Sequence, residues 1–480
     1  MIYSQKQITT LREESVGGYE RIVQLVRQYD DDQPAKMITA RQQHQLFGRV
    51  PNSMSDNVIK LILTSTASLL QFDAWEVSAP TVDQGGAPED TATIEDDQRE
   101  AHPVKVWLDD LYMRNQLRRH QYHVHRATLR DADHAVSLAC RNNRVMLFRE
   151  PYWDGNTGVW IGYNADGEYE VAVREWWERN WSTSKLTKRR NVYYPDMFQR
   201  FYRDGEAWRP ITDPDHTTPL EAAIATDGSV PWVKAPGDPL GIPMVHFAYD
   251  SRGDSPYGRS DVAGLLGLQD DLNSMQHDIS AAAKFTGFQQ LWGKMLGLKG
   301  RLLQGPGVAH DFESPDAELH VIPAGNMDAL TEAHAYKRKT IALDSETPMP
   351  SVDGAQWPTG EALLQFKQPQ FNKAIRLGNS LGPSWTLVAH RAVEIANAFL
   401  GMDLDEDAPI TTVFGDVRQL DDITIAKAQA EQARVMETIS RIQDVALIRE
   451  LDFLDPATIE ALIRDRAASG PFDDNTAGEW

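Results

Sequence analysis

The feature that most constrains the fold of this 480-residue chain is an apolar stripe within residues 258–285. Its members step by three and four residues and are Leu265, Leu268, Leu272, Met275, Ile279 and Ala282. Such spacing places side chains on one face of a helix and is typical of helices that pack against helices. A continuous helix over this segment spans about 42 Å. The pattern by itself favours cover from the same chain, although neighbouring subunits in a ring could also cover the stripe.

Two more segments with helical periodicity follow, separated by stretches that glycine and proline interrupt. Residues 286–325 are punctuated in this way, and a second helix is predicted over 327–343. Residues 347–360 contain three prolines and two glycines, so they cannot form a regular helix. A long helical pattern then runs over 361–400, with an interruption expected near 378–383. The predicted order is helix, punctuated insert, helix, broken loop and long helix.

The first half of the chain mixes helical and strand patterns. Helices are predicted over 22–29, 56–72 and 105–130. Between 145 and 210, short alternating segments are separated by Asp-Gly pairs at 154–155, 166–167 and 204–205. Alternation flanking Asp-Gly is a strong hairpin signal, so this part is predicted to be antiparallel sheet. The expected fold class is α+β.

The charge balance is strongly acidic, with 70 Asp and Glu against 48 Lys and Arg and a formal net charge of −22. Proteins that grip DNA concentrate basic residues against phosphates, so the balance argues against a tight DNA binder but not against a surface along which DNA slides. The single cysteine, Cys140, excludes an internal disulfide and fits assembly in a reducing cytoplasm. We expect neither a membrane span nor a secretory signal, because apolar runs are short and the first residues are polar.

Three patterns could indicate catalysis or a cofactor, and each lacks a required part. Histidines and aspartates gather without zinc-site spacing at His120, His123, His125, Asp131, Asp133 and His134. The glycines within 293–307 lack the Gly-Lys-Ser/Thr ending of a phosphate-binding loop. Gly378, Ser380 and Gly382 match a nucleophile elbow, but Pro383 follows, so a helix break is favoured. We expect no catalytic residue, metal or cofactor; a metal-dependent enzyme using the histidines stays the least favoured alternative.

Residues 241–273 contain the most specific motif of the chain. It reads Gly-Ile-Pro-Met-Val-His-Phe at 241–247, Ser-Pro-Tyr-Gly-Arg-Ser-Asp at 255–261 and Leu-Gln-Asp-Asp-Leu-Asn at 268–273. This order resembles the approach to the stem helix in portal proteins of tailed double-stranded DNA bacteriophages, of the long-tailed type. Residues 191–202 resemble part of the family's wing, and 359–363 resemble the start of its long helix.

The resemblance implies the portal fold, an α+β subunit arranged in a ring around an axial channel. The implied parts are a wing over 1–255 that is β-rich at about 145–210, a stem helix at 256–285, a clip at 286–325, a second stem helix at 326–346, a tunnel loop at 347–360, a long wing helix and following strand at 361–416, and a helical crown with a C-terminal tail at 417–480. The apolar stripe would then be the packing seam of the stem.

The same resemblance suggests which side chains face DNA. The tunnel-loop candidates are Met349, Ser351, Val352, Asp353, Gln356 and Trp357. Asp270, Asp271 and Asp278 lie off the stripe and are candidates for lining the channel, or else are solvated surface. A negative wall suits transport, because many fixed Lys or Arg contacts with phosphates would stall a moving duplex.

The implied function is a portal at one capsid vertex, through which double-stranded DNA is packaged and ejected. The implied partners are further copies of the chain in a homo-oligomer (in the family a dodecamer), the DNA, the terminase large subunit, the head–tail adaptor, and the major capsid and scaffolding proteins. The implied location is the virion, after assembly in the host cytoplasm, with no membrane contact. Another capsid-associated connector or scaffold is the alternative.

Overall fold

The computed structural model describes residues 2–16, 19–31, 57–77, 102–179, 184–212, 224–251, 255–287, 291–294, 316, 318–321, 327–349 and 360–415. All of these residues belong to one compact unit, Met1–Val417. The crown predicted for 417–480 lies outside the described residues, as do the interior of the predicted clip and most of the predicted tunnel loop.

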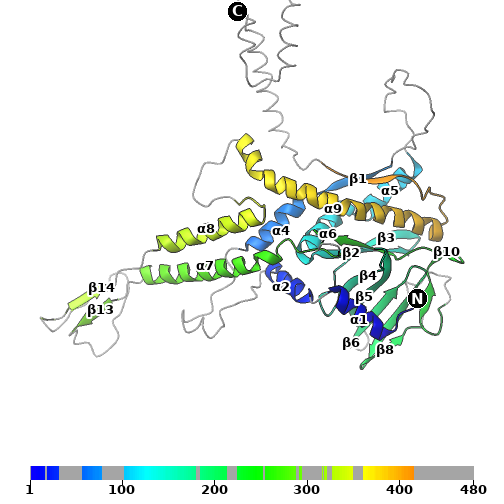
Figure 1. Cartoon of the computed structure of the whole chain (residues 1–480), viewed down its shortest axis with the longest axis horizontal. Helices are drawn as coiled ribbons and strands as arrows, with labels where there is room; N and C mark the ends of the chain where they lie inside the picture. The colour runs from blue at the N-terminus through cyan, green and yellow to red at the C-terminus, as the bar shows by residue number, and fades with distance from the viewer. Residues whose placement is uncertain are drawn as a thin grey trace, which may run out of the picture. The chain divides into compact units, whose positions relative to one another are not determined.

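The described helices alternate with strands along the chain, which gives the expected α+β class. They are α1 (Gln5–Val16), α2 (Glu20–Asp30), α4 (Val58–Leu69), α5 (Pro103–Arg114), α6 (Leu117–Asp131), the short 3-10 helix η2 (Ala263–Leu265), α7 (Leu266–Gly287), α8 (Asp328–Asp344) and α9 (Gly360–Leu400). In Figure 1, α9 crosses over the strands of the body, and its contacts with β2, β12, β15 and α4 agree with this view.

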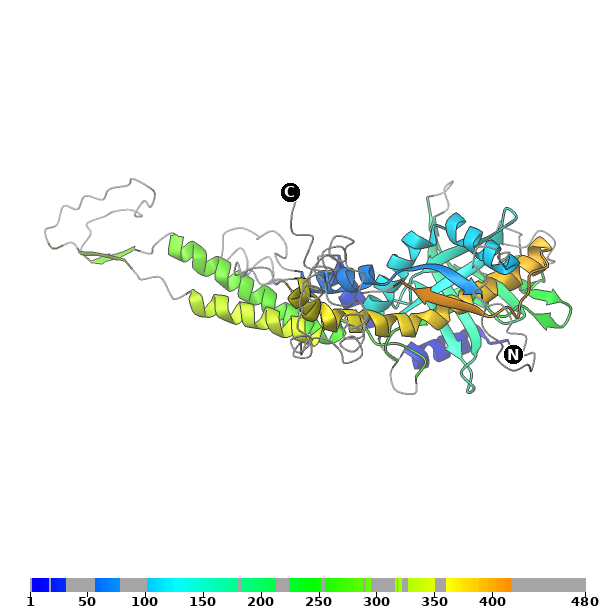
Figure 2. The same ribbon diagram turned by 90° about the horizontal axis from the view of Figure 1, so that it is seen from above.

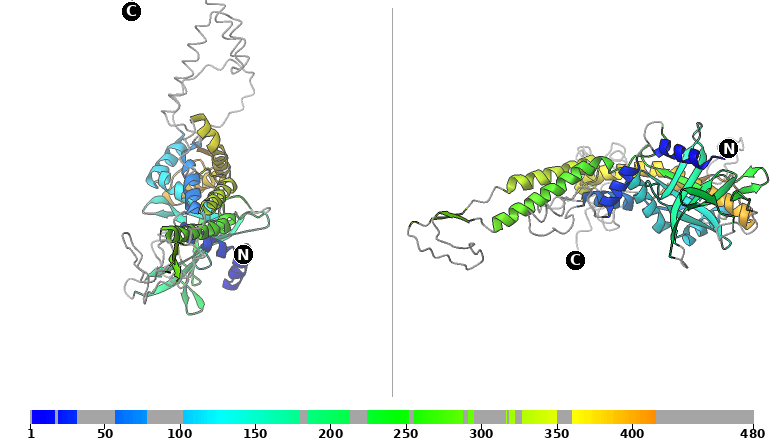
Figure 3. Two further views of the ribbon diagram at one scale, coloured as in Figure 1. Left: turned by 90° about the vertical axis from the view of Figure 1, so that its left-hand side faces the viewer. Right: turned by 90° about the horizontal axis from the view of Figure 1, so that it is seen from below.

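The strands form several antiparallel sheets. Their bounds are β1 (Phe72–Val77), β2 (Asp133–Arg141), β3 (Arg144–Glu150), β4 (Gly158–Tyr163), β5 (Tyr169–Arg179), β6 (Leu186–Tyr193), β7 (Met197–Asp204), β8 (Ala207–Pro210), β9 (Ser229–Pro231), β10 (Val233–Ala235), β11 (Asp238–Pro239), β12 (Met244–Ala248), β13 (Leu291–Lys294), β14 (Glu318–Val321) and β15 (Ile410–Phe414). The largest sheet has the order β4-β5-β6-β7-β8, with β9 also paired to β7. A second sheet has the order β12-β2-β3, and the two-stranded sheets are β1-β15, β10-β11 and β13-β14. Helix α1 lies against β4, as Figure 3 shows.

Two of the three Asp-Gly pairs form the predicted hairpins, while the pair at 154–155 lies in the loop between β3 and β4, which are not paired with each other. Gly155, Gly167 and Gly205 have φ values of +93°, +81° and +64°. The pairs at 166–167 and 204–205 connect β4 to β5 and β7 to β8, both antiparallel. Glycine is favoured at such positions because it adopts positive φ without steric cost. The predicted antiparallel sheet between 145 and 210 is therefore confirmed.

Helix α9 runs without interruption through the segment where a break was expected, so that prediction was wrong. Pro369 and Pro383 lie inside the helix on its exposed side, where water can satisfy a carbonyl that loses its helical partner. Next to Pro383, the Ser384 hydroxyl donates a hydrogen bond of 2.7 Å to the carbonyl oxygen of His246, on β12. Gly378 has the Leu70 and Phe414 side chains within 3.3 Å of where a Cβ would stand, so the glycine permits close packing rather than ending the helix.

The predicted helix over 105–130 is two helices, α5 and α6. Gln116 adopts a φ of +51° between them, which no helix can continue through. The Asn115 side chain stabilises this turn, since its amide nitrogen donates to the Val145 carbonyl at 3.3 Å and its amide oxygen accepts from the Leu147 N–H at 3.0 Å. The turn thereby connects α5 and α6 to β3.

The main core joins segments that are far apart in the chain. Phe72 and Trp75 from β1 pack on Trp385 from α9, with ring centroids of Phe72 and Trp385 5.0 Å apart. The Trp75 indole N–H donates to the Trp385 carbonyl at 3.0 Å. All three rings are at most 1% exposed, so they hold α9 against the β1-β15 sheet.

Candidate functional site

Helices α7 and α8 form an antiparallel pair that ends in a β-hairpin. The chain leaves α7 towards β13 and returns from β14 into α8, and Trp292 of β13 pairs with His320 of β14. Figures 1 and 2 both show the helices side by side, with the two strands beyond their far end. The described residues therefore follow the predicted order of helix, insert and helix.

The first of these helices begins later than predicted, and Gly258 shows why. A Cβ on Gly258 would lie 2.3 Å from the Ala132 carbonyl oxygen and 2.6 Å from that of Tyr249, so only glycine fits. Its N–H donates to Asp133 Oδ1 at 2.7 Å, and the neighbouring Tyr257 hydroxyl donates to the Ile161 carbonyl at 2.7 Å. Residues 255–262 are thus held as a loop against the sheets, and helical structure starts only at Ala263.

A buried ion pair joins the bases of the two helices to α9. The Lys373 ammonium of α9 contacts the Asp261 carboxylate at 2.5 Å and donates to the Ser345 carbonyl at 2.8 Å. Asp261 stands just before η2 and Ser345 follows the last residue of α8. The side chains of Lys373 and Asp261 are 2% and 10% exposed. Burial raises the pKa of Asp261, and the Lys373 ammonium opposes that rise.

The first turns of α7 are fixed by α2 and α4. Gln269 is fully buried, and its side-chain oxygen accepts from the Val58 N–H at 3.1 Å, at the start of α4. The Tyr29 hydroxyl of α2 donates to the Asp270 carboxylate. Asp270 therefore contacts its own subunit, and its role as a channel-lining acid stays a prediction. A sequence pattern could not reveal this contact, because Tyr29 and Asp270 are 241 residues apart.

The predicted seam is only partly covered by its own chain. Leu265 and Leu272 are buried, at 6% and 0% exposure. The other four members are half-buried: Leu268, Met275, Ile279 and Ala282. Helix α8 packs along α7. Among the described residues, the outer members of the seam are less covered than Leu272.

The exposed faces of the two helices differ in character. On α7, Asp271 and Asp278 are exposed, and Asp271 forms an ion pair of 2.5 Å with Lys337 of α8. On α8, Tyr336 and Leu343 are 72% and 68% exposed. Since they are seven residues apart, they lie on the same face of that helix. Lys339 and Thr340 lie between them on that face, so Tyr336 and Leu343 are two separate exposed apolar groups.

The structure describes one of the six tunnel-loop candidates. Met349 is 8% exposed and belongs to the main hydrophobic core of the chain. Its contact with DNA stays a prediction. Ser351, Val352, Asp353, Gln356 and Trp357 lie outside the described residues.

The histidine group is divided among structural roles. The His125 Nε2 accepts from the Trp385 indole N–H at 2.9 Å, so its Nδ1 carries the proton and donates to the Leu70 carbonyl at 3.1 Å. Burial lowers the pKa of His125 to about 4 and that of His134 to about 3. Among the described residues, no three His, Cys, Asp or Glu side chains come together as a possible metal site.

No protein-family model matches this chain, and no curated protein matches it either. Among solved structures, the neck of an empty GTA particle, computed with C6 symmetry, is similar to it at 13% sequence identity. The similarity covers 84% of this chain and 88% of that chain, with a TM-score of 0.36. We draw nothing about fold or function from a likeness of that size. Within the part of the chain that is described, no helix has the length and hydrophobicity of a bilayer span.

Proposed function

We propose that this chain is the portal subunit of a tailed double-stranded DNA bacteriophage. In this proposal, copies of the chain form a ring at one capsid vertex, and DNA enters and leaves through the ring. The observation that carries the proposal is the half-covered seam on α7 beside the exposed Tyr336 and Leu343 side chains of α8. The motif at 241–273, which resembles that of portal proteins, supports the same function.

The contacts at the base of the pair fit a helix pair that must stand in a ring. Asp261, Lys373 and Ser345 tie the start of η2, the end of α8 and α9 together, while Gly258 ties the preceding loop to the sheets. The 22 residues of α7 extend about 33 Å from this base. In the proposed ring, Tyr336 and Leu343 of one subunit cover the outer part of the neighbour's seam, so each subunit supplies the cover that its own chain lacks.

The electrostatics suit a channel that does not hold DNA. The chain carries a net charge of −22, and Asp278 is exposed on α7. Carboxylates near phosphates repel the duplex, so it would slide without forming the cation contacts that slow it. In this proposal the chain is not an enzyme and needs no cofactor; the packaging ATPase is a partner, the terminase large subunit. The same proposal places a head–tail adaptor, the major capsid protein and scaffolding protein among the partners, and the chain in the virion.

Negative-stain electron microscopy of the purified protein tests the ring. We expect rings with a central hole, and we expect the double substitution Tyr336→Glu with Leu343→Glu to abolish them while the subunit stays folded by circular dichroism. Leu186→Glu is the matched control, because Leu186 is also exposed, at 57%, but lies on β6. Compact monomers from the unaltered protein would contradict the proposal, as would rings that survive the double substitution.

The channel is tested separately in assembled particles. Asp278→Asn together with Asp271→Asn removes exposed negative charge from α7, and we expect packaging or ejection of DNA to slow or stop. Asp204→Asn, at the end of β7, controls for loss of an exposed acid elsewhere. DNA packaging and release at the unaltered rate in the α7 variant would count against a negative channel wall.

A further inference from the structure

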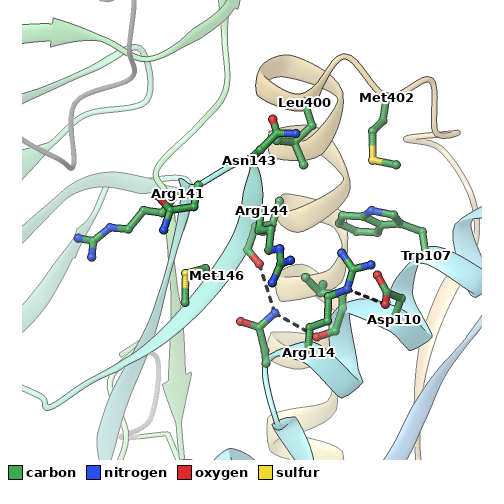
Figure 4. Close-up of a pocket in the computed structure, with 13 residues that line it drawn as sticks. Trp107, Asp110, Arg114, Arg141, Asn143, Arg144, Met146, Leu400 and Met402 are labelled. Atoms are coloured by element: carbon green, nitrogen blue, oxygen red, sulfur yellow. Dashed lines mark hydrogen bonds and ion pairs between the residues drawn. The ribbon is translucent and has the colours of Figure 1, made fainter.

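A basic cavity lies on the body of the chain, away from the α7–α8 pair. Its volume is about 570 Å³, and it is enclosed by α5, the β2–β3 hairpin and the end of α9. Arg114, Arg141, Arg144, Trp107, Met146 and Met402 are among its lining residues. Figure 4 shows the Arg114 and Arg144 side chains on the same side as the Trp107 ring, with Met402 above them.

The arginines of this cavity carry more positive charge than their neighbours neutralise. Arg114 forms an ion pair of 2.7 Å with Asp110. Among the described residues, Arg141 and Arg144 have no ion pair, and the buried Nε of Arg141 has no hydrogen-bond partner. Arg141 stacks over the Phe148 ring instead, with 5.1 Å between the guanidinium carbon and the ring centroid. Figure 4 shows Arg141 directed away from Arg144 and Arg114, so the guanidinium groups of Arg141 and Arg144 lie on opposite sides of the hairpin end and, of these two, only that of Arg144 faces Trp107.

Further basic residues lie on the elements next to the cavity, Arg149 on β3 and Arg119 on α6. Burial and, after it, the charge of Arg119 lower the pKa of Arg149. Residues 102–149 contain nine Lys and Arg against four Asp and Glu, in a chain whose net charge is −22. The surface is a local exception to the charge of the molecule.

The apolar side chains around the cavity favour a protein ligand over a nucleic acid. Met146 and Met402, which line the cavity, are 37% and 38% exposed, and Trp107 lines it as well. A phosphate backbone gains nothing from covering these groups, whereas arginine, tryptophan and methionine are enriched at protein interfaces. Methionine also adapts its shape to different apolar partners. Charge and hydrophobicity together fit a protein segment that carries both carboxylates and large apolar side chains.

We infer that the surface formed by Trp107, Arg114, Arg141, Arg144, Met146 and Met402 binds an acidic amphipathic peptide segment of a partner protein. The partner's carboxylates contact Arg141 and Arg144, and one apolar side chain enters the cavity beside Trp107. The inference does not depend on ring formation, since none of these residues belongs to α7 or α8.

Fluorescence anisotropy with three labelled probes tests this binding. The first probe is a helical peptide with Glu on one face and Leu on the other, the second has Lys in place of each Glu, and the third is a short DNA duplex. We expect the acidic peptide to bind and the other two probes to bind at least about tenfold more weakly. Equal or tighter binding of the duplex would overturn the inference in favour of nucleic acid.

Substitutions locate the site. Arg141→Glu with Arg144→Glu should weaken binding of the acidic peptide by about tenfold or more, and Met146→Ser should weaken it by about threefold. Arg209→Glu is the matched control, since Arg209 is an exposed arginine on β8. Circular dichroism establishes that each variant is folded. Peptide binding that is unchanged by the charge reversal, or equally weakened by Arg209→Glu, would overturn the inference.

Discussion

Helices α9 and α7 both carry apolar side chains at steps of three and four residues, but they differ in what covers those side chains. The α9 stripe includes Leu377, Leu381, Trp385 and Val388, all at most 1% exposed. Strands β2, β12 and β15 and helix α4 pack on it. On α7, which packs along α8, the seam is buried at Leu272 but only half-buried at Met275 and Ile279.

The apolar face of α9 is buried within its own chain, whereas the apolar face of α7 is only partly buried within it. The spacing of apolar residues indicates that one face of a helix is apolar, but it does not indicate whether the same chain or another molecule covers that face. In α9 the cover is internal, so the helix tolerates two prolines. In α7 and α8 the remaining apolar surface is available to neighbouring copies, which is the physical basis of the proposed ring.

The largest expected effect is at the ion pair that joins the two regions. Lys373→Met leaves the Asp261 carboxylate buried without its cation, and we expect the free energy of unfolding to fall by about 3–5 kcal/mol. Urea denaturation of dissociated subunits, followed by circular dichroism, measures it. Adding Asp261→Asn to the variant should restore part of the loss. A loss below about 1 kcal/mol would mean that the pair does not hold the helices to α9.

Matched truncations on the two helices test the comparison directly. Leu381→Ala on α9 should lower the free energy of unfolding of the dissociated subunit by about 2–5 kcal/mol, because it opens a cavity in a closed core. Ile279→Ala on α7 should cost about 1 kcal/mol or less in the same experiment, since Ile279 is half-buried. The second variant should instead lower the concentration of urea at which assembled rings dissociate. Equal losses in the subunit would remove the distinction between the helices.

A buried carboxylate in the body, Asp131, should make the stability of the subunit depend on pH. Burial alone would raise the pKa of Asp131, but Arg130 and Arg27 outweigh it and the pKa is lowered. Its stabilising contribution is therefore fully present above the ordinary range of Asp, about 4, and is lost as the pH falls through the lower folded value. The stability difference between the protein and Asp131→Asn should be largest near neutral pH and shrink under acid. Urea titrations across that range measure it, and a constant difference contradicts the assignment.

The smallest effect is expected at the exposed ion pair between α7 and α8. The side chains of Lys337 and Asp271 are 27% and 59% exposed. Water and salt screen such a pair, so Asp271→Asn should change the free energy of unfolding by less than about 1 kcal/mol. Thermal denaturation of subunits at low and high salt checks this, and a larger, salt-insensitive loss would show that the pair is shielded from solvent.

Several local features could be predicted from the sequence because short-range chemistry determines them. The Asp-Gly hairpins at 166–167 and 204–205 are confirmed, since a positive φ at glycine depends on neighbouring residues alone. The predicted helix over 327–343 agrees within a residue with α8. The break near Gly378 was predicted wrongly, because local propensity favoured it while burial of the α9 stripe against four other elements opposed it.

The candidate site was predicted less completely than the fold. The sequence predicted the apolar stripe on α7 and the order of helix, insert and helix, but it could not predict that Asp270 contacts Tyr29 or that Met349 is buried in the main core. It also gave no sign of the basic cavity, whose arginines come from separate elements. The net charge of the chain could not predict that surface, because a net charge does not show where Lys and Arg side chains lie in the fold.

By itself, the amino-acid sequence determined where the chain turns, which segments are helical and which of their faces are apolar, since these follow from steric limits and side-chain spacing. Only the tertiary structure decided which carboxylates are buried and which helices are covered. Asp261 and Lys373 are 112 residues apart, and Trp75 and Trp385 are 310 apart. Such contacts form because the whole chain minimises exposed apolar surface and leaves few buried charges unpaired, and no local pattern records their partners.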